Sequence, residues 1–582
     1  MKRKEESNNV NVSLDGESVA VHQHKINKKM TALTAAVVIA VIILNVAISA
    51  IGDANMWFAD MTDTRYTDEN TALYTISDEC RELVGREAVS QIESVNAQRA
   101  ARGEQAIKLK VVFCSDKDVI EGDSLMCYVS YTARALAKEF PHAIEVEYIN
   151  IEQNPSAVQK YKTTSAATIY NSDIIVEFGS EYLVHKVSSF YYQDSTEDAP
   201  WAYNGEQRLA ATILAMTRAE APICALTSNH GEQLFDGDGN IKSEYSEFIK
   251  LVGGAGYEVK AIDLEKDAIP ENCRMIITFA PTKDFYGYGN MGESGVSEIE
   301  KLDRYLDGSN SFFYICDPDT PELKNLEEYL EEWGVAIARG ENGYGEEENY
   351  VVRDEVNCTD VGRGDAVLGN YVDFGLGGKI TEDMRKSAYP ARVVFPNSTA
   401  ICPSPTYNRI WVKDGEEADA PTYSYYNYYR NGVNRNLLDV FTTYSSANAE
   451  VGGEVYEVAT EQSRFRLMTI TQEERQVQEG NYNSVNKASY VLALASTDFV
   501  KNDVLTSTAY GNTDVVLSAL RSTSTEIVPT DVQIKVFYIY DMADNAAYAQ
   551  SGADIWMTCL CVVPPVVLAT VGIMVITRRK YR

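Results

Sequence analysis

The chain has 582 residues, of which 45% are hydrophobic and 24% are charged, and its formal net charge is −33 at pH 7. This composition is typical of folded globular domains, and the length suits about three or four of them. The negative charge argues against a nucleic-acid-binding protein, because phosphates require positive charge on their partner. The ten cysteines include no CxxC pair, and the histidines show no metal spacing within the main domains, residues 52–554. We therefore expect no zinc ribbon, no redox pair and no bound metal.

Two long apolar segments contain no charged residue, Met30–Ile51 and Ile555–Thr577. About 20 such residues are needed to cross the roughly 30 Å hydrocarbon core of a bilayer. Lysines and arginines flank the outer end of each segment, which favours a cytoplasmic position for both chain ends. The sequence thus predicts a protein of the cell membrane with two transmembrane helices, cytoplasmic tails at residues 1–29 and 578–582, and extracytoplasmic main domains. The alternatives are a cleaved signal peptide for the first segment and a buried core helix for the second.

Residues 52–200 follow a β-α-β-β order. We expect strands at Ile107–Cys114 and Ala143–Ile151, a helix at Ser124–Phe140 between them, and a closing hairpin after them. This order suits a thioredoxin-like domain. The segment Ser115–Asp118 reads SDKD where such a fold would carry its redox cysteines, so we expect no redox chemistry there.

Residues 201–340 alternate strands with amphipathic helical patterns, which predicts a largely parallel sheet of flavodoxin-like or amidotransferase-like outline. The expected strands are Pro222–Ser228, Tyr257–Asp263, Arg274–Ala280 and Phe312–Cys316. Thr320 before Pro321 predicts the N-cap and first position of the next helix.

Residues 341–486 are expected to form a β-rich insertion in this α/β domain. The insertion contains a tyrosine-rich stretch, Tyr423–Tyr429. Residues 487–554 then close the α/β domain, with a core strand at Ser489–Ala495 and a helix at Asn512–Leu520.

Four groups of short motifs occur in order along the chain. They are Arg65-Tyr66-Thr67 with Tyr74-Thr75-Ile76-Ser77; Gly205-Glu206 with Ser228-Asn229-His230-Gly231-Glu232; Ile269-Pro270 with Ile276-Ile277, Ala280-Pro281 and Asp317-Pro318; and Ala495-Ser496-Thr497-Asp498-Phe499 with Gly511-Asn512-Thr513-Asp514. On these motifs the chain resembles the gliding-motility-associated (GldG-like) auxiliary proteins of ABC transport systems. The resemblance covers most of the chain, and residues 341–486 depart from it most. It implies an extracytoplasmic subunit that works with a multi-span permease and a cytoplasmic ATPase.

Neither of the common nucleotide-binding motifs is present in a usable context. No GxxxxGK[ST] occurs, so the chain is not itself the transport ATPase. Gly287–Gly292 spells GxGxxG, but residues 281–286 separate it from the preceding strand, whereas a dinucleotide fingerprint begins directly after its strand. We therefore interpret this segment as a loop and expect no cofactor.

The best candidate site is His230-Gly231-Glu232, at the end of a strand where parallel sheets bind ligands. His230, Glu232 and Asp317, which follows another strand, are the predicted ligand or partner contacts. A histidine near a carboxylate can perform acid–base chemistry. However, no Ser or Cys stands on a GxSxG nucleophile elbow, and Cys316 is the one conceivable thiol nucleophile. We therefore predict no catalytic residue.

The leading hypothesis is a non-catalytic, substrate-engaging auxiliary subunit of an ABC-type transport system. One alternative is a cell-surface receptor or carbohydrate-binding protein in which the tyrosine-rich stretch stacks on a glycan. Another is an extracytoplasmic hydrolase or amidotransferase-like enzyme that uses His230 and Cys316.

Overall fold

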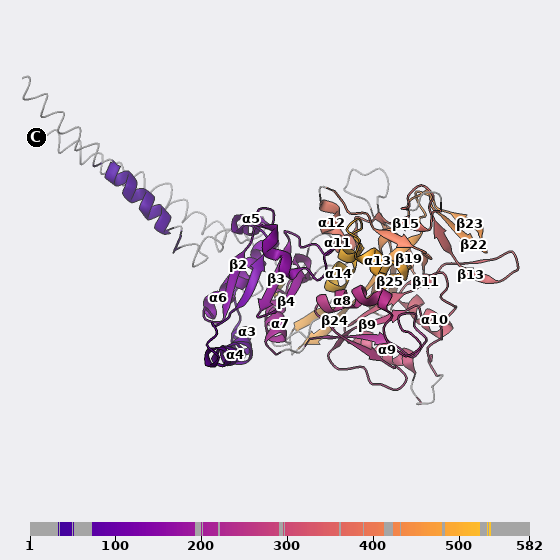
Figure 1. Ribbon diagram of the computed structural model, residues 1–582, viewed down its shortest axis with the longest axis horizontal. Helices are drawn as coiled ribbons and strands as arrows, with labels where there is room; N and C mark the ends of the chain where they lie inside the picture. Colours follow the sequence, from indigo (N-terminus) through magenta and orange to yellow (C-terminus); the bar gives the residue numbers. More distant parts are fainter. Residues whose placement is uncertain are drawn as a thin grey trace, which may run out of the picture. The chain divides into compact units, whose positions relative to one another are not determined.

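A computed structural model describes residues 33, 35–48, 50–51, 73–192, 200, 202–218, 221–289, 295, 297–359, 363–387, 389–412, 423–430, 432–479, 483–523, 532 and 535–536. The chain divides into two compact units, residues 1–65 with 539–582, and residues 66–538 (Figure 1). All the sheets and the candidate site belong to the second unit.

No helix in the described ranges is long and apolar enough to cross a membrane. The prediction of a two-span protein of the cell membrane with cytoplasmic ends and extracytoplasmic domains is therefore wrong. The second predicted span, Ile555–Thr577, lies outside the described residues.

The prediction of a mixed α/β protein is confirmed. A first sheet has the order β2-β1-β3-β4. β1 (Leu109–Phe113) is parallel to β2 (Ile144–Tyr148) and antiparallel to β3 (Asp173–Phe178), and β3 forms a hairpin with β4 (Glu181–Lys186). Helices α5 (Lys117–Gly122) and α6 (Met126–Glu139) connect β1 to β2. These segments lie where the sequence placed the β-α-β-β pattern.

Helix α7 (Gly205–Arg218) belongs to the core beneath this first sheet. Leu209 and Ile213 of α7 are fully buried in one cluster with Val111 of β1 and Val176 of β3. The helices α3 (Asp78–Leu83), η1 (Val84–Val89) and α4 (Ser90–Ala101) bury their apolar side chains in the same cluster. The first core thus also includes residues of α7 up to Leu214, and Val532.

Five parallel strands form one end of a 12-stranded sheet, in the order β25-β10-β9-β7-β8. They are β7 (Ile223–Thr227), β8 (Glu258–Ile262), β9 (Cys273–Phe279), β10 (Ser311–Ile315) and β25 (Asn483–Leu494). Read from β8 to β25 and numbered along the chain, these strands have the order 2-1-3-4-5 of flavodoxin-like doubly wound sheets. The strand order reverses between β7 and β9, and this crevice is where such sheets place ligands.

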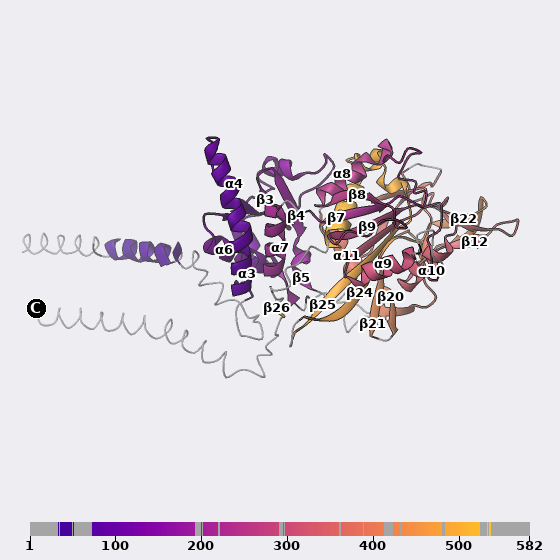
Figure 2. The same cartoon turned by 90° about the horizontal axis from the view of Figure 1, so that it is seen from below.

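The two faces of this sheet carry separate cores. On one face Leu226, Ile277 and Phe313 pack with helices α8 (Ser246–Gly254) and α14 (Asn512–Ser522). On the other face the neighbouring residues Ala225, Ile276 and Phe312 pack with α9 (Glu298–Asp307) and α10 (Lys324–Glu332). Side chains of a strand alternate between faces, so these uniformly apolar strands require helices on both sides. Figure 2 shows α8 and α9 on either side of the labelled strands.

Antiparallel strands continue the sheet beyond β25 in the order β24-β21-β20-β19. They are β24 (Arg466–Glu479), β21 (Val433–Thr442), β20 (Tyr423–Arg430) and β19 (Asn408–Val412). Much of the expected β-rich insertion is therefore an extension of the main sheet.

Helix α10 begins later than the sequence predicted. Its first residue is Lys324, and Thr320 lies in the preceding turn, where its hydroxyl donates to Asp317 Oδ1 at 3.0 Å. The Glu327 side chain instead accepts from the backbone N–H of Leu323, the N-cap residue, at 2.9 Å. Thr320 therefore stabilises the turn after β10 and does not cap α10. Its side chain can do either, because Ser, Thr and Asp form hydrogen bonds in turns as readily as at helix ends.

Candidate functional site

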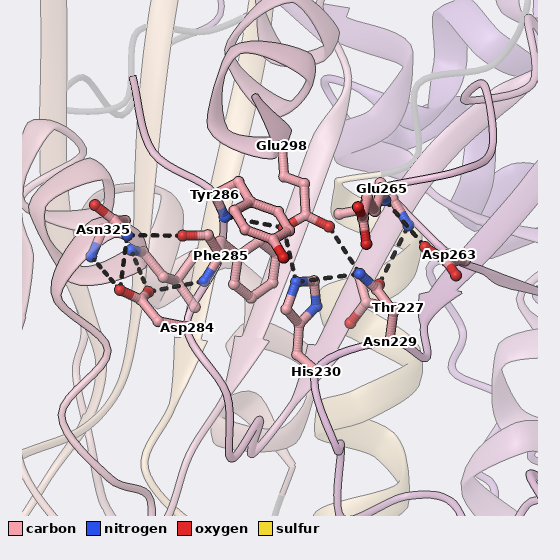
Figure 3. Close-up of polar contacts among 12 residues, drawn as sticks. Thr227, Asn229, His230, Asp263, Glu265, Asp284, Phe285, Tyr286, Glu298 and Asn325 are labelled. Atoms are coloured by element: carbon pink, nitrogen blue, oxygen red, sulfur yellow. Dashed lines mark hydrogen bonds and ion pairs between the residues drawn. The ribbon is translucent and has the colours of Figure 1, made fainter. Parts of the chain in front are cut away.

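His230 lies three residues beyond β7, at the crevice where the strand order of the parallel sheet reverses (Figure 3). The loop after β9 crosses directly beside it, since Thr282 and Lys283 both donate backbone N–H groups to the His230 carbonyl, at 2.8 and 2.9 Å. Gly231 permits this approach. Its φ is +69°, and a Cβ at this position would lie 2.3 Å from Thr282 Oγ1.

Two carboxylates lie on opposite sides of the His230 ring. Nε2 is 2.9 Å from Glu298 Oε2, and Nδ1 is 3.4 Å from Glu232 Oε1. The other Glu232 oxygen accepts from the backbone N–H of His230 at 2.9 Å. All three side chains are almost fully buried. The predicted pair of His230 and Glu232 is therefore brought together, and Glu298 joins it from 68 residues away.

The His230 ring also stacks on Phe285, with centroids 3.7 Å apart and an interplanar angle of 8°. Burial by itself lowers the pKa of His230, but the hydrogen bonds and charges of Glu232 and Glu298 outweigh it and raise the pKa to about 9. His230 is accordingly an imidazolium at neutral pH. A cation stacked on an aromatic face is further stabilised by the ring quadrupole.

Glu298 is held by more than the histidine. It accepts from Asn229 Nδ2 at 2.7 Å and from the backbone N–H of Tyr286 at 2.9 Å. It occupies the first turn of α9, whose N-cap Ser297 accepts from the Glu300 N–H, and the helix dipole favours an anion at this end. Burial opposes ionisation, yet the His230 hydrogen bond and charge lower the pKa of Glu298 below its ordinary value.

The loop after β9 is fixed at a second point, the start of α10. Asp284 accepts from the backbone N–H groups of Asn325 and Leu326, at 2.9 and 3.2 Å, so it caps that helix from outside. Gly287, the first glycine of the GxGxxG segment, lies so close to Asn325 that a Cβ would be 2.4 Å from its Oδ1. Packing against α10 therefore accounts for this glycine. Residues 290–292 of the segment lie outside the described residues.

Asp317, the third predicted contact, belongs to a separate network. Its carboxylate accepts from Thr320 Oγ1 at 3.0 Å and from Thr497 Oγ1 at 2.9 Å, and the residue is 3% exposed. Asn349 Nδ2 donates to the carbonyls of the same turn. Asp317 thus joins the end of β10 to the segment after β25. Its carboxylate is engaged within the protein.

The chemistry that this arrangement can perform is limited. A general base must be neutral, and His230 remains protonated near neutral pH with both nitrogens facing carboxylates. Cys316 is fully buried, its Sγ lies 3.7 Å from the Leu494 carbonyl, and burial raises the pKa of its thiol well above the ordinary value. A nucleophilic thiolate requires the opposite environment.

The tyrosine-rich strand β20 makes contacts within the protein. Tyr423 and Tyr425 stack on Phe374, and Tyr428 stacks on Tyr407 at 5.6 Å. Of this strand, Tyr429 is the exposed tyrosine, at 73%. Tyr423, Tyr425 and Tyr428 are therefore each in contact with an aromatic neighbour of the same protein.

Sequence reasoning missed Glu298 and Phe285. Glu298 falls within one of the amphipathic helical patterns of residues 201–340 but is not one of its apolar positions, and Ser297 with Glu300 marks a helix start without indicating a contact with His230. Phe285 lies in residues 281–286, between the predicted strand and the segment interpreted as a loop. From the alternation of strands and helices, Glu298 and Phe285 could have been placed at the same edge of the sheet as His230. Their contacts with His230 could not have been predicted in this way.

Comparison with known proteins gives little further information. No family model matches the chain, and no curated protein matches it. Among solved structures, the mmIFT52 N-terminal domain matches at 12% sequence identity, over 53% of this chain and 99% of that chain, with a TM-score of 0.31. A TM-score this low supports no inference about fold or function.

Proposed function

We propose that this chain is a non-catalytic auxiliary subunit of an ABC-type transport system, which engages a multi-span permease and an ATPase partner. The observation that carries the non-catalytic part is the environment of His230 at the ends of β7 and β9. Its ring lies between the Glu232 and Glu298 carboxylates, which raise its pKa to about 9, so it keeps its proton near neutral pH and is not available as a general base.

The role within a transport system rests on the motif resemblance, and the arrangement of those motifs supports it. Residues from motifs far apart in the sequence meet in space. Ser77 contacts Glu206, and Asp317 contacts Thr497. These motifs therefore stabilise one shared scaffold, which is the expected role of residues in a subunit that acts by binding.

The proposal is tested by purifying the tagged full-length chain from cells that produce it naturally and identifying the proteins recovered by mass spectrometry. We expect an ATPase with a phosphate-binding loop and a protein with many transmembrane segments, at recoveries well above those from the same tag on an unrelated acidic protein. Recovery of this chain alone, after chemical crosslinking as well, would contradict the transport assignment and favour a receptor.

Two variants separate binding from catalysis. His230→Gln and Cys316→Ala should leave the recovery of both partners unchanged, provided that each variant folds as judged by circular dichroism. Loss of a cellular phenotype in either folded variant, with partners still bound, would instead support an enzyme.

A further inference from the structure

A small three-stranded sheet in the β-rich region has an exposed outer strand. Its order is β14-β22-β23, with β14 at Val351–Arg353, β22 at Asn448–Val451 and β23 at Glu454–Val458. Val352 of β14 also bridges to Ser398, so that side of the sheet is joined to the rest of the unit. Among the described strands, β23 pairs only with β22 and forms the edge (Figure 1).

A tight two-residue turn joins β22 to β23. Gly452 and Gly453 connect the two strands with φ of +60° and +83°. Two consecutive residues with positive φ form the tight turn whose twist matches a β-hairpin, and glycine adopts it without steric cost. The edge strand is therefore held in a defined register with its partner.

Strand β23 exposes apolar side chains as well as backbone. Val455, Tyr456 and Val458 are 55%, 53% and 58% exposed. Ala459 donates its N–H to Ala447, toward β22. Because hydrogen-bonding groups alternate along a strand, the N–H and C=O of Val458 point away from β22, toward solvent. Such an edge is a template for another strand.

The surroundings of this edge are acidic. Residues 340–349 and 448–461 contain eight glutamates and neither lysine nor arginine. The first range holds β13 (Glu347–Asn349) and the last two residues of β12 (Arg339–Glu341); Arg339 lies just before the range and pairs with Glu327. The two hairpins are in contact, since Gly452 N–H donates to Glu348 Oε2 at 3.0 Å and a Cβ on Gly340 would lie 2.9 Å from the Tyr456 ring.

Seven glutamates of the two hairpins and of the segment after β23 are solvent-exposed. They are Glu341, Glu346, Glu347, Glu348, Glu454, Glu457 and Glu461. Glu450 is paired with Arg353, 2.7 Å away, and Glu461 with Arg464, 2.5 Å away. Natural sheets protect exposed edges with charge, commonly lysine. The same device with glutamate repels a second copy of this edge and attracts a strand of opposite charge.

We propose that β23 binds an extended segment of a partner protein in which basic and apolar residues alternate, by addition of one strand to the β14-β22-β23 sheet. Backbone hydrogen bonds to β23 supply affinity, and the valines and Tyr456 contact the apolar side chains. The flanking glutamates select lysine or arginine at the intervening positions. This inference stands on the edge geometry and does not depend on the transport assignment.

The test uses the full-length protein and a fluorescent peptide, acetyl-Lys-Val-Lys-Val-Lys-Val-Lys-amide, with binding followed by anisotropy. One control peptide replaces every lysine with glutamate, and another keeps the charge but carries proline at the central valine, which removes a ladder donor. The protein variants are Val458→Lys and Glu454→Lys. Val119→Lys is the matched control, because Val119 is also exposed, at 60%, but lies on α5.

We expect the basic peptide alone to bind, with affinity at least tenfold weaker for Val458→Lys and Glu454→Lys and unchanged for Val119→Lys. All three substitutions are at exposed positions, so thermal unfolding should be unaltered. No binding of the basic peptide overturns the proposal, as does equal binding of the proline peptide, which would indicate charge attraction alone. Concentration-dependent dimerisation that Val458→Lys abolishes also overturns it, in favour of a second copy at this edge.

Discussion

The Glu206 carboxylate accepts hydrogen bonds from both the backbone N–H and the hydroxyl of Ser77, at 2.6 and 2.7 Å. Its other oxygen forms an ion pair with Lys535 Nζ at 2.9 Å. Lys535 also donates to the carbonyls of Leu73 and Thr75. Residues 73–77 begin, and residues 535–536 end, the described part of the second unit. One buried carboxylate therefore ties the two ends of this unit together.

We expect Glu206→Ala to make the segment at residues 74–81 open more readily, by about 3 kcal/mol, because removal of one member of a buried ion pair leaves the other uncompensated. Amide hydrogen exchange of this segment measures the change. Glu258→Ala is the control, since Glu258 is exposed and pairs with the exposed Lys260. That variant should shift exchange by less than about 0.5 kcal/mol. Equal exchange in both variants would show that Glu206 does not hold the two ends.

Stability should depend on pH through His230. Its pKa in the folded protein is about 9, above the ordinary value of 6.5, so its contribution is complete below about pH 6.5 and is lost as pH rises through about 9. This shift corresponds to stabilisation on the order of 3 kcal/mol. Urea unfolding at pH 6.5 and 9.5 should show lower stability at the higher pH.

A variant isolates this effect from other titrating groups. Glu298→Gln keeps the shape of the side chain but removes one of the two charges that raise the pKa of His230. The histidine C–H resonance should then titrate closer to pH 6.5, and the loss of stability between pH 6.5 and 9.5 should shrink. An unchanged titration midpoint would mean that Glu298 does not stabilise the imidazolium.

Gly231→Ala should destabilise the crevice. The φ of +69° strains an alanine by about 1–2 kcal/mol, and the new methyl group would overlap Thr282 Oγ1. Thr282→Ala removes the overlapping oxygen, so the double variant should recover the steric part and keep the backbone part. A double-mutant cycle of unfolding free energies measures this coupling. Simple additivity of the two substitutions would be evidence against contact between the two residues.

Much of the parallel sheet could be predicted because its local signals agree. The strand predicted at Arg274–Ala280 is β9, and the helix predicted at Asn512–Leu520 is α14, since apolar runs and helical periodicity leave few alternatives there. The helix start predicted at Thr320 was wrong, because threonine side chains form hydrogen bonds in turns as well as at helix caps. The pattern over Gly205–Glu220 predicts a helix, but a hydrophobic stripe does not indicate which core the helix enters, and α7 packs against the first sheet.

Only part of the candidate site, His230 and Glu232, could be predicted from the sequence. His230 and Glu232 are neighbours along the chain, and the strand before them placed them at the edge of the sheet. Glu298 and Phe285 reach His230 through tertiary packing of α9 and the β9 loop, which no local pattern encodes. Without Glu298 the site resembled an incomplete acid–base pair. With it, the histidine is a buried cation between two anions.

The thiol of Cys316 gives the most direct test of the enzyme alternative. Burial raises the pKa of this thiol, and the nearby Asp317 and Glu327 carboxylates raise it further. Because the thiolate is the reactive species, iodoacetamide at pH 8 should modify Cys316 in the native protein about 100-fold more slowly than in urea. Cys358, which is only half-buried, reports in the same sample that the reagent is active. Stoichiometric modification of native Cys316 within minutes, detected by peptide mass spectrometry, would instead require an accessible, activated thiol and revive a nucleophilic mechanism.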